Sequence, residues 1–109
     1  MQDIRPNIVF IITDQHNYQC MGVAGHDTVK TPNLDSLAAE GVLFENAYCG
    51  TMACGPSRAS MFSGVYADSH KMHGNNADMR PADLPVIPEL LKEAGYQTAL
   101  VGKLHVHPF

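Results

Sequence analysis

The residues best suited to chemistry lie in one short stretch, residues 54–64 (CGPSRASMFSG). Cys54 stands just ahead of Pro56, which favours the first turn of a helix, and Gly64 suits the position after its last turn. A helix start favours negative charge, so a thiol placed there can act as a nucleophile. Arg58, one turn further along, offers a fork of N–H donors that suits an oxyanion. We therefore predict a helix over 56–63 that delivers a nucleophile.

Two more groups of polar residues follow apolar runs. Asp14 comes after the run 7–13, and Lys103 and His105 come after the run 97–101. In open α/β sheets, ligands bind at the carboxyl ends of the strands. If the strands are parallel and adjacent, these groups converge with the nucleophile on one rim. Lys103 and His105 alternate on an extended segment, so both can face the same side.

The predicted site combines a carboxylate, a nucleophile and several cationic or proton-donating groups. Together they would bind a tetrahedral dianionic ester and neutralise the charge that develops in its cleavage. The carboxylate of Asp14 is then best explained as a ligand for a hard divalent cation.

Each residue also has an ordinary structural explanation. Cys54 can be a small buried apolar residue, and Arg58 can be a charge on a helix surface. Lys103 and His105 can be solvated residues at a strand end, and Asp14 can belong to a loop or cap a helix. Their common order and spacing favour the joint site over these separate explanations.

The elements that must position these residues predict an α/β fold, a parallel-type sheet with helices on both faces. The run 7–13 is rich in β-branched and aromatic residues and does not alternate with polar ones, which is typical of a strand buried on both faces. A strand, a helix and a second strand follow one another up to residue 48, and a right-handed crossover is the simplest packing. Residues 18–31 read as a loop, and residues 65–85 favour a long loop. The expected strands are 7–13, 42–48 and 97–101, and the expected helices are 32–40, 56–63 and 88–94.

Composition excludes several classes of protein. The 109 residues carry a formal net charge of −4 and no basic run, so neither nucleic acid nor an anionic membrane is an expected partner. The longest apolar run, Ile8 to Ile12, is far too short to span a membrane. The three cysteines are an odd number, so we expect no disulfide scaffold, and they show no metal-site spacing such as Cys-x-x-Cys. No signal peptide precedes the first run, so a cytoplasmic location is expected if the chain starts at its natural start.

The cysteine motif, Cys54-x-Pro56-Ser57-Arg58 followed by Ser63-Gly64, resembles the signature of the type I sulfatases, the formylglycine-dependent members of the alkaline phosphatase-like superfamily. The similarity covers nearly the whole chain and implies a sulfatase-like α/β fold. It extends to residues 7–15, 31–41, 44–48, 94–98 and 102–105.

The resemblance implies that Cys54 is oxidised to formylglycine, whose hydrated aldehyde is the nucleophile. One hydroxyl attacks sulfur and the alcohol leaves; the second hydroxyl then helps to expel sulfate. Pro56 and Arg58 belong to the sequence that a formylglycine-generating maturation enzyme reads, and Arg58 supports the hydrate. Lys103 and His105 match residues that contact the sulfate and the leaving oxygen of a small-molecule sulfate ester.

The resemblance also implies a metal site at Asp14 and Gln15, which the modified Cys54 side chain would reach. The metal is commonly calcium and sometimes magnesium. Many relatives have a second aspartate where this chain has Gln15, which can ligate through its carbonyl oxygen but removes a negative charge. The same change occurs in branches that include phosphonate monoester hydrolases, whereas Lys103 and His105 favour a sulfatase.

Two further residues, His73 and Asn75, match a loop near the substrate in relatives and are candidate substrate-binding residues; a solvated loop is the alternative. Because the family's catalytic domain is several times longer, we expect residues 1–109 to be an N-terminal, incomplete portion that is inactive alone. The alternatives to a sulfatase are a phosphonate monoester hydrolase or phosphodiesterase of the same superfamily, and a non-catalytic module with Cys54 unmodified.

Overall fold

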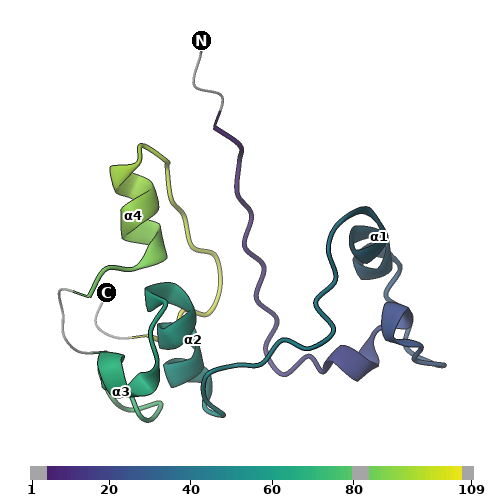
Figure 1. The fold of residues 1–109 in the computed structure, drawn as a ribbon, viewed down its shortest axis with the longest axis horizontal. Helices are drawn as coiled ribbons and strands as arrows, with labels where there is room; N and C mark the ends of the chain where they lie inside the picture. The colour runs from purple at the N-terminus through teal and green to yellow at the C-terminus, as the bar shows by residue number, and fades with distance from the viewer. Residues whose placement is uncertain (1–4, 80–83, 107–109) are drawn as a thin grey trace. The chain divides into compact units, whose positions relative to one another are not determined.

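The structure is a computed structural model that describes residues 5–79 and 84–106. The chain divides into two compact units, Met1–Asn46 and Ala47–Phe109. Figure 1 labels the helices that each unit contains. The two units are described separately below.

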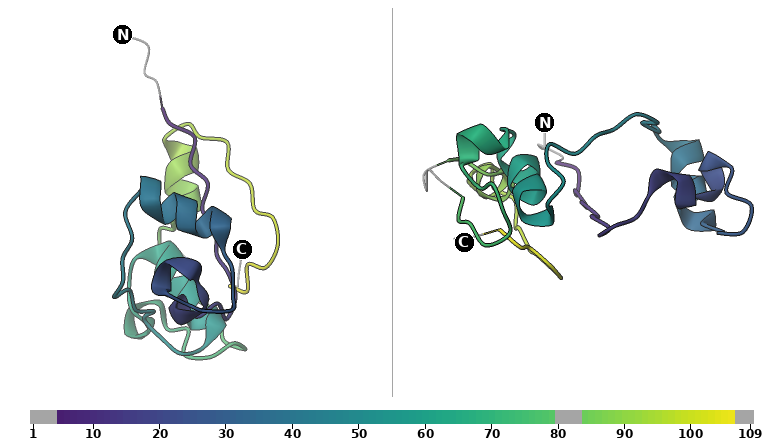
Figure 2. Two further views of the ribbon diagram at one scale, coloured as in Figure 1. Left: turned by 90° about the vertical axis from the view of Figure 1, so that its right-hand side faces the viewer. Right: turned by 90° about the horizontal axis from the view of Figure 1, so that it is seen from below.

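The first unit begins with a run without regular structure and continues into two 3-10 turns, η1 (Tyr18–Cys20) and η2 (Gly22–Ala24). Helix α1 (Pro32–Glu40) follows and lies beside η2 (Figure 2). Its bounds confirm the predicted helix, because Pro32 occupies the first turn and Gly41 follows the last residue. Residues 18–24, which the sequence suggested were loop, are therefore partly helical.

A small hydrogen-bond network fastens α1 to η2. The Oδ1 atom of Asp35 accepts from the Val23 amide at 2.8 Å and from the Thr31 hydroxyl at 2.9 Å. The Thr31 hydroxyl oxygen in turn accepts from the Gly22 amide at 2.8 Å. An acidic side chain in the first turn of a helix is also favoured by the helix dipole. These polar contacts therefore connect α1 to η2 within the first unit.

The second unit is built around helix α2 (Cys54–Ser63), which contacts α3 (Ala67–His70) and α4 (Ile87–Glu93). Its last turn ends at Gly64, whose φ of 72° is left-handed and whose amide donates to the Ser60 carbonyl. Apolar side chains from α2 and from the segments around it form the core of this unit. The buried apolar residues are Ala59, Phe62, Met72, Met79, Val86 and Val106.

Two predictions about these helices need correction. Helix α2 begins at Cys54, two residues before the predicted start, so Cys54 is its first residue rather than a loop residue ahead of it. The predicted loop 65–85 contains α3, a single turn whose Asp68 and His70 both favour loops in isolation. Residues 80–83 of this predicted loop lie outside the described part of the chain.

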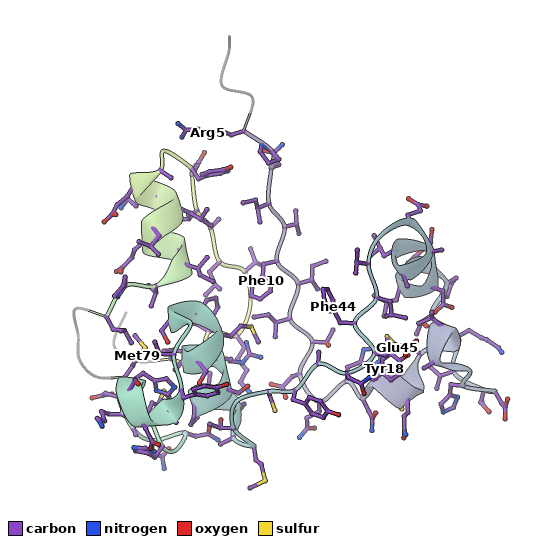
Figure 3. The ribbon with its side chains drawn as sticks, viewed as in Figure 1. Arg5, Phe10, Tyr18, Phe44, Glu45 and Met79 are labelled. Carbon is purple, nitrogen blue, oxygen red and sulfur yellow. The ribbon has the colours of Figure 1, made fainter. Side chains whose placement is uncertain are left out.

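The three predicted strands form no β ladder within residues 5–79 and 84–106. The run 7–13 is exposed rather than buried on both faces: Val9 is 82% and Ile11 75% exposed, and Figure 3 shows Phe10 standing out from the chain. Val101, in the third predicted strand, is 98% exposed. A strand exists only when a neighbour accepts its hydrogen bonds, so an apolar run predicts a preference for burial and not the neighbour. The parallel sheet stays a prediction.

Within the described ranges, no helix combines the length and the hydropathy that crossing a bilayer requires.

Candidate active site

The half-buried side chain of Cys54 has three polar neighbours in the second unit. Its sulfur lies 3.2 Å from Nδ1 of His105, 3.4 Å from Oδ1 of Asn75 and 3.9 Å from Nζ of Lys103. These residues come from segments 21 to 51 positions away in sequence. The structure thus brings together the predicted nucleophile, Lys103 and His105, and adds Asn75 to them.

Asn75 holds the start of α2 as well as the thiol. The same Oδ1 atom accepts the Gly55 amide at 2.9 Å. The first amides of a helix have no partner inside it, and Pro56 has no amide hydrogen, so Gly55 carries one of the few donors at this end. The prediction that these amides favour an anion is therefore modified, since Asn75 already occupies the Gly55 donor. Substrate contact by Asn75 stays a prediction.

Gly55 allows the surrounding segments to approach Cys54 closely. A Cβ atom at this position would stand 2.7 Å from Cε of Met72, 3.1 Å from Oδ1 of Asn75 and 3.2 Å from the His105 carbonyl oxygen. No side chain fits there without displacing its neighbours. Gly55 and Met72 are site residues that the sequence reasoning missed; the small residue directly after the nucleophile was the one available signal.

Arg58 is buried, with 7% of its surface exposed, so it is not a charge on the helix surface. Its Nη1 atom donates to the Lys103 carbonyl oxygen at 2.7 Å. A charge-assisted hydrogen bond of this kind is about twice as strong as a neutral one. In the structure, Arg58 therefore fixes the backbone of the segment that carries Lys103 and His105.

The backbone at His105 differs from the prediction. Its φ of 55° is left-handed, so the backbone at His105 is not extended and the predicted alternation of Lys103 and His105 along an extended segment does not hold there. Gln15, a predicted metal ligand in the first unit, has a φ of 56°. Non-glycine residues in this region are uncommon and gather at functional sites.

The remaining candidates are not brought to Cys54 by any described contact. His73 is exposed, and no hydrogen bond within the described residues joins it to Cys54. Asp14 and Gln15 are exposed residues of the first unit, so their role beside Cys54 stays a prediction.

The predicted metal ligands, Asp14 and Gln15, carry oxygen donors. The carboxylate of Asp14 and the amide oxygen of Gln15 are hard oxygen donors, which calcium and magnesium prefer. Calcium takes about six to eight oxygens, so two residues supply only part of a site. Among the described residues, no group of three or more His, Cys, Asp or Glu side chains could hold a metal ion. The donor types fit a hard cation, and further ligands are required.

The chain is similar in sequence to known sulfatases. Residues 6–109 match the protein family described as Sulfatase. The chain is 41% identical over 102 residues to an N-acetylglucosamine-6-O-sulfatase of Bacteroides thetaiotaomicron, covering 94% of this chain and 18% of that protein. It is 41% identical over 105 residues to an arylsulfatase of Clostridium perfringens, covering 96% of this chain and 22% of that protein.

A solved structure shows the same similarity in three dimensions. BT4656, in complex with its substrate D-glucosamine-2-N,6-O-disulfate, superposes with a TM-score of 0.90 at 39% identity, over 97% of this chain and 21% of that one. The chain therefore spans about a fifth of the length of the proteins it matches.

Proposed function

Since this chain belongs to the sulfatase family, we propose that residues 1–109 are part of a catalytic domain that hydrolyses sulfate monoesters. The observation that carries the proposal is the convergence of His105 and Lys103 on the sulfur of Cys54, at 3.2 and 3.9 Å. In the complete domain, the exposed runs 7–13 and 97–101 are proposed to become strands of a parallel sheet covered by helices.

The proposed nucleophile derives from Cys54. Once oxidised to formylglycine and hydrated, this residue would supply one hydroxyl that attacks sulfur and a second that expels sulfate. A plain thiol would form a thiosulfate ester, which has no such internal exit. The proposed partner for this oxidation is a formylglycine-generating maturation enzyme that reads the segment containing Pro56 and Arg58.

The surrounding side chains have separable roles. The Lys103 ammonium attracts the sulfate oxygens and stabilises the charge that grows on them. The His105 ring, within hydrogen-bond reach of position 54, is suited to deliver a proton to the departing alcohol oxygen. Arg58 holds the segment bearing both residues through the Lys103 carbonyl. Asn75 orients residue 54 through the thiol and the Gly55 amide.

Asp14 and Gln15, together with the oxidised Cys54 side chain, would hold a divalent cation, with calcium as first choice and magnesium as second. Such a cation supplies positive charge against the sulfate oxygens. Gln15 contributes a neutral oxygen in place of a second carboxylate, so this site carries one negative charge fewer.

The substrate class follows from the relatives. Two of them are an N-acetylglucosamine-6-O-sulfatase and a human N-acetylgalactosamine-6-sulfatase, and the relative of solved structure is bound to its substrate, a sulfated glucosamine. We therefore propose a small sulfate ester, with a 6-O-sulfated amino sugar as the first compound to test and an aryl sulfate as the second. His73, on the exposed loop beside Asn75, is a proposed substrate contact.

The test is mass spectrometry of the peptide containing Cys54, isolated from full-length protein made in its native host. Formylglycine at this position, with metal-dependent sulfate release that a Cys54→Ala variant lacks, is the expected result. An intact thiol in a protein that turns over sulfate esters would contradict the formylglycine mechanism.

The second candidate is phosphonate or phosphate ester hydrolysis, which the glutamine at position 15 leaves open. Parallel rates with matched sulfate and phosphonate esters separate the two activities, and a higher kcat/KM for the phosphonate replaces the first proposal with the second. Oxidised Cys54 without turnover of either ester would favour a non-catalytic module.

A further inference from the structure

His70 is a fully buried polar residue that the proposed reaction does not use, at 0% exposure. It is the last residue of α3, and its ring makes two hydrogen bonds. Nδ1 accepts the Met72 amide at 3.1 Å, and Nε2 lies 2.9 Å from the Ser60 hydroxyl oxygen. A backbone amide only donates, so Nδ1 carries no proton. In the neutral ring, Nε2 then carries the proton and donates a hydrogen bond to the Ser60 hydroxyl oxygen.

This ring joins the two segments that meet at the nucleophile. Ser60 belongs to α2, the helix whose first residue is Cys54. Met72 is fully buried and belongs to the segment 71–75, which ends at Asn75. The Cε atom of Met72 packs directly against Gly55. His70 is therefore connected to residue 54 in two ways, through Ser60 on α2 and through Met72 on segment 71–75.

We propose that His70, in its neutral form, is a positioning residue that clamps segment 71–75 onto α2, so that Asn75 can hold the Gly55 amide and the side chain at position 54. The effect of this clamp on catalysis rests on the function proposed above. Whether His70 holds segment 71–75 on α2 can be tested without turnover.

The surroundings of His70 favour the neutral ring. Burial is the largest effect and lowers the pKa of His70. Hydrogen bonding to the backbone of His70 itself and to that of Pro56 acts in the opposite direction, and the nearby His73 lowers the pKa further. From α2, the groups that face the ring are the uncharged Ser60 hydroxyl and Pro56 carbonyl. Protonation would place a second N–H against the Met72 amide and break that hydrogen bond.

The sign of the pH dependence follows from this direction. Because the pKa of His70 is lower in the folded state than its ordinary value of 6.5, the folded protein binds the proton less readily than the unfolded chain. The stabilisation is fully present above pH 6.5 and is lost as the pH falls from there through the lowered pKa. The clamp should therefore open on the acid side.

The decisive experiment measures hydrogen exchange of the Gly55 amide in full-length protein carrying His70→Leu, His70→Asn or neither. We expect His70→Leu to speed this exchange by about 10-fold or more, because it removes the acceptor for Met72. His70→Asn keeps an acceptor near the Nδ1 position and should restore most of the protection. His26→Asn is the matched control, since its Nδ1 also accepts backbone amides, from Thr28 and Val29, but in the first unit.

Three further readouts separate positioning from general stability. Nitrogen chemical shifts should show Nδ1 of His70 unprotonated at pH 7; a protonated Nδ1 overturns the proposal. His70→Leu should lower kcat more than it changes KM. In the wild type, kcat should decrease at acid pH together with the protection of the Gly55 amide.

Unchanged Gly55 exchange in His70→Leu, even with a lower melting temperature, also overturns the clamp. If wild type turns over no ester, the proposed function fails, while the Gly55 exchange still decides the clamp.

Discussion

Asn75 contacts both Cys54 and the start of α2. One amide oxygen accepts both the thiol, at 3.4 Å, and the backbone amide of Gly55, at 2.9 Å. Hydrogen bonds to the helix start and to the nucleophile are therefore made by a single atom. Loss of that atom should disturb the position of residue 54 more than it disturbs the fold.

For Asn75→Leu we expect the free energy of unfolding to fall by about 1–3 kcal/mol, since the part-buried Gly55 amide loses its partner. We also expect kcat for a sulfate ester to fall at least about 10-fold while KM changes little. Denaturant unfolding and steady-state kinetics of the full-length protein check both. The neighbouring Asn76→Leu is the control; an equal loss there would contradict a specific role for Asn75.

For Arg58→Lys we expect a loss even though the charge is kept. Lysine cannot reproduce the planar fork of donors, so the hydrogen bond to the Lys103 carbonyl is weakened in a buried position. A charge-assisted hydrogen bond contributes about 1.5–3 kcal/mol, so kcat/KM should fall about 10- to 100-fold. Kinetics of the variant beside Lys92→Arg, a substitution on the exposed side of α4, provide the comparison. Full activity in Arg58→Lys would mean that this bond does not position Lys103.

At the scale of elements, α2 is the helix that presents residue 54. It starts at Cys54 and stops at Gly64, where the left-handed backbone closes the last turn with a hydrogen bond to the Ser60 carbonyl. Its buried side faces α3 and α4. The helix end is therefore determined locally, and its orientation is determined by its neighbours.

For Gly64→Ala we expect the free energy of unfolding to decrease by about 1–2 kcal/mol, the cost of a left-handed conformation for a residue with a Cβ. Space is not the cause, because a Cβ at position 64 meets nothing within 4 Å. Gly74→Ala is a matched control, since position 74 is equally open but its φ is not positive. Equal unfolding free energies for the two variants would refute the conformational explanation.

At the scale of the whole molecule, large apolar side chains of the two units face solvent. Val9 and Val101 are 82% and 98% exposed, and Phe44 is 75% exposed. Runs of this kind are ordinarily covered by a neighbouring strand or helix. The chain also spans about a fifth of the length of its relatives.

We therefore expect the isolated 109-residue chain to release sulfate from an aryl sulfate only at the background rate, with or without calcium. Its apolar runs lack cover, and Asp14 and Gln15 supply only part of a metal site. A colorimetric assay of the isolated chain beside the full-length protein makes the measurement. Clear metal-dependent turnover by the isolated chain would show that residues 1–109 are sufficient.

Much of the helical structure could be predicted because its signals are local. Pro32 and Gly41 bound α1, and Gly64 follows α2, as expected from the conformations these residues favour. The single turn α3 was missed because four residues carry too little periodic signal. The strands were inferred from apolar runs, but a strand is completed by a partner, which such a run cannot specify.

The type and order of the chemical groups could be predicted from the sequence alone. The motif around Cys54 lies in one short segment, and Lys103 and His105 lie in another. Only the tertiary structure decided how they are held: Asn75 on Gly55 across 20 residues, Arg58 on Lys103 across 45, and His70 on Ser60 across 10. Local backbone preferences set helix ends within a few residues, whereas a hydrogen bond between distant side chains exists only after packing has brought both partners within about 3 Å of each other.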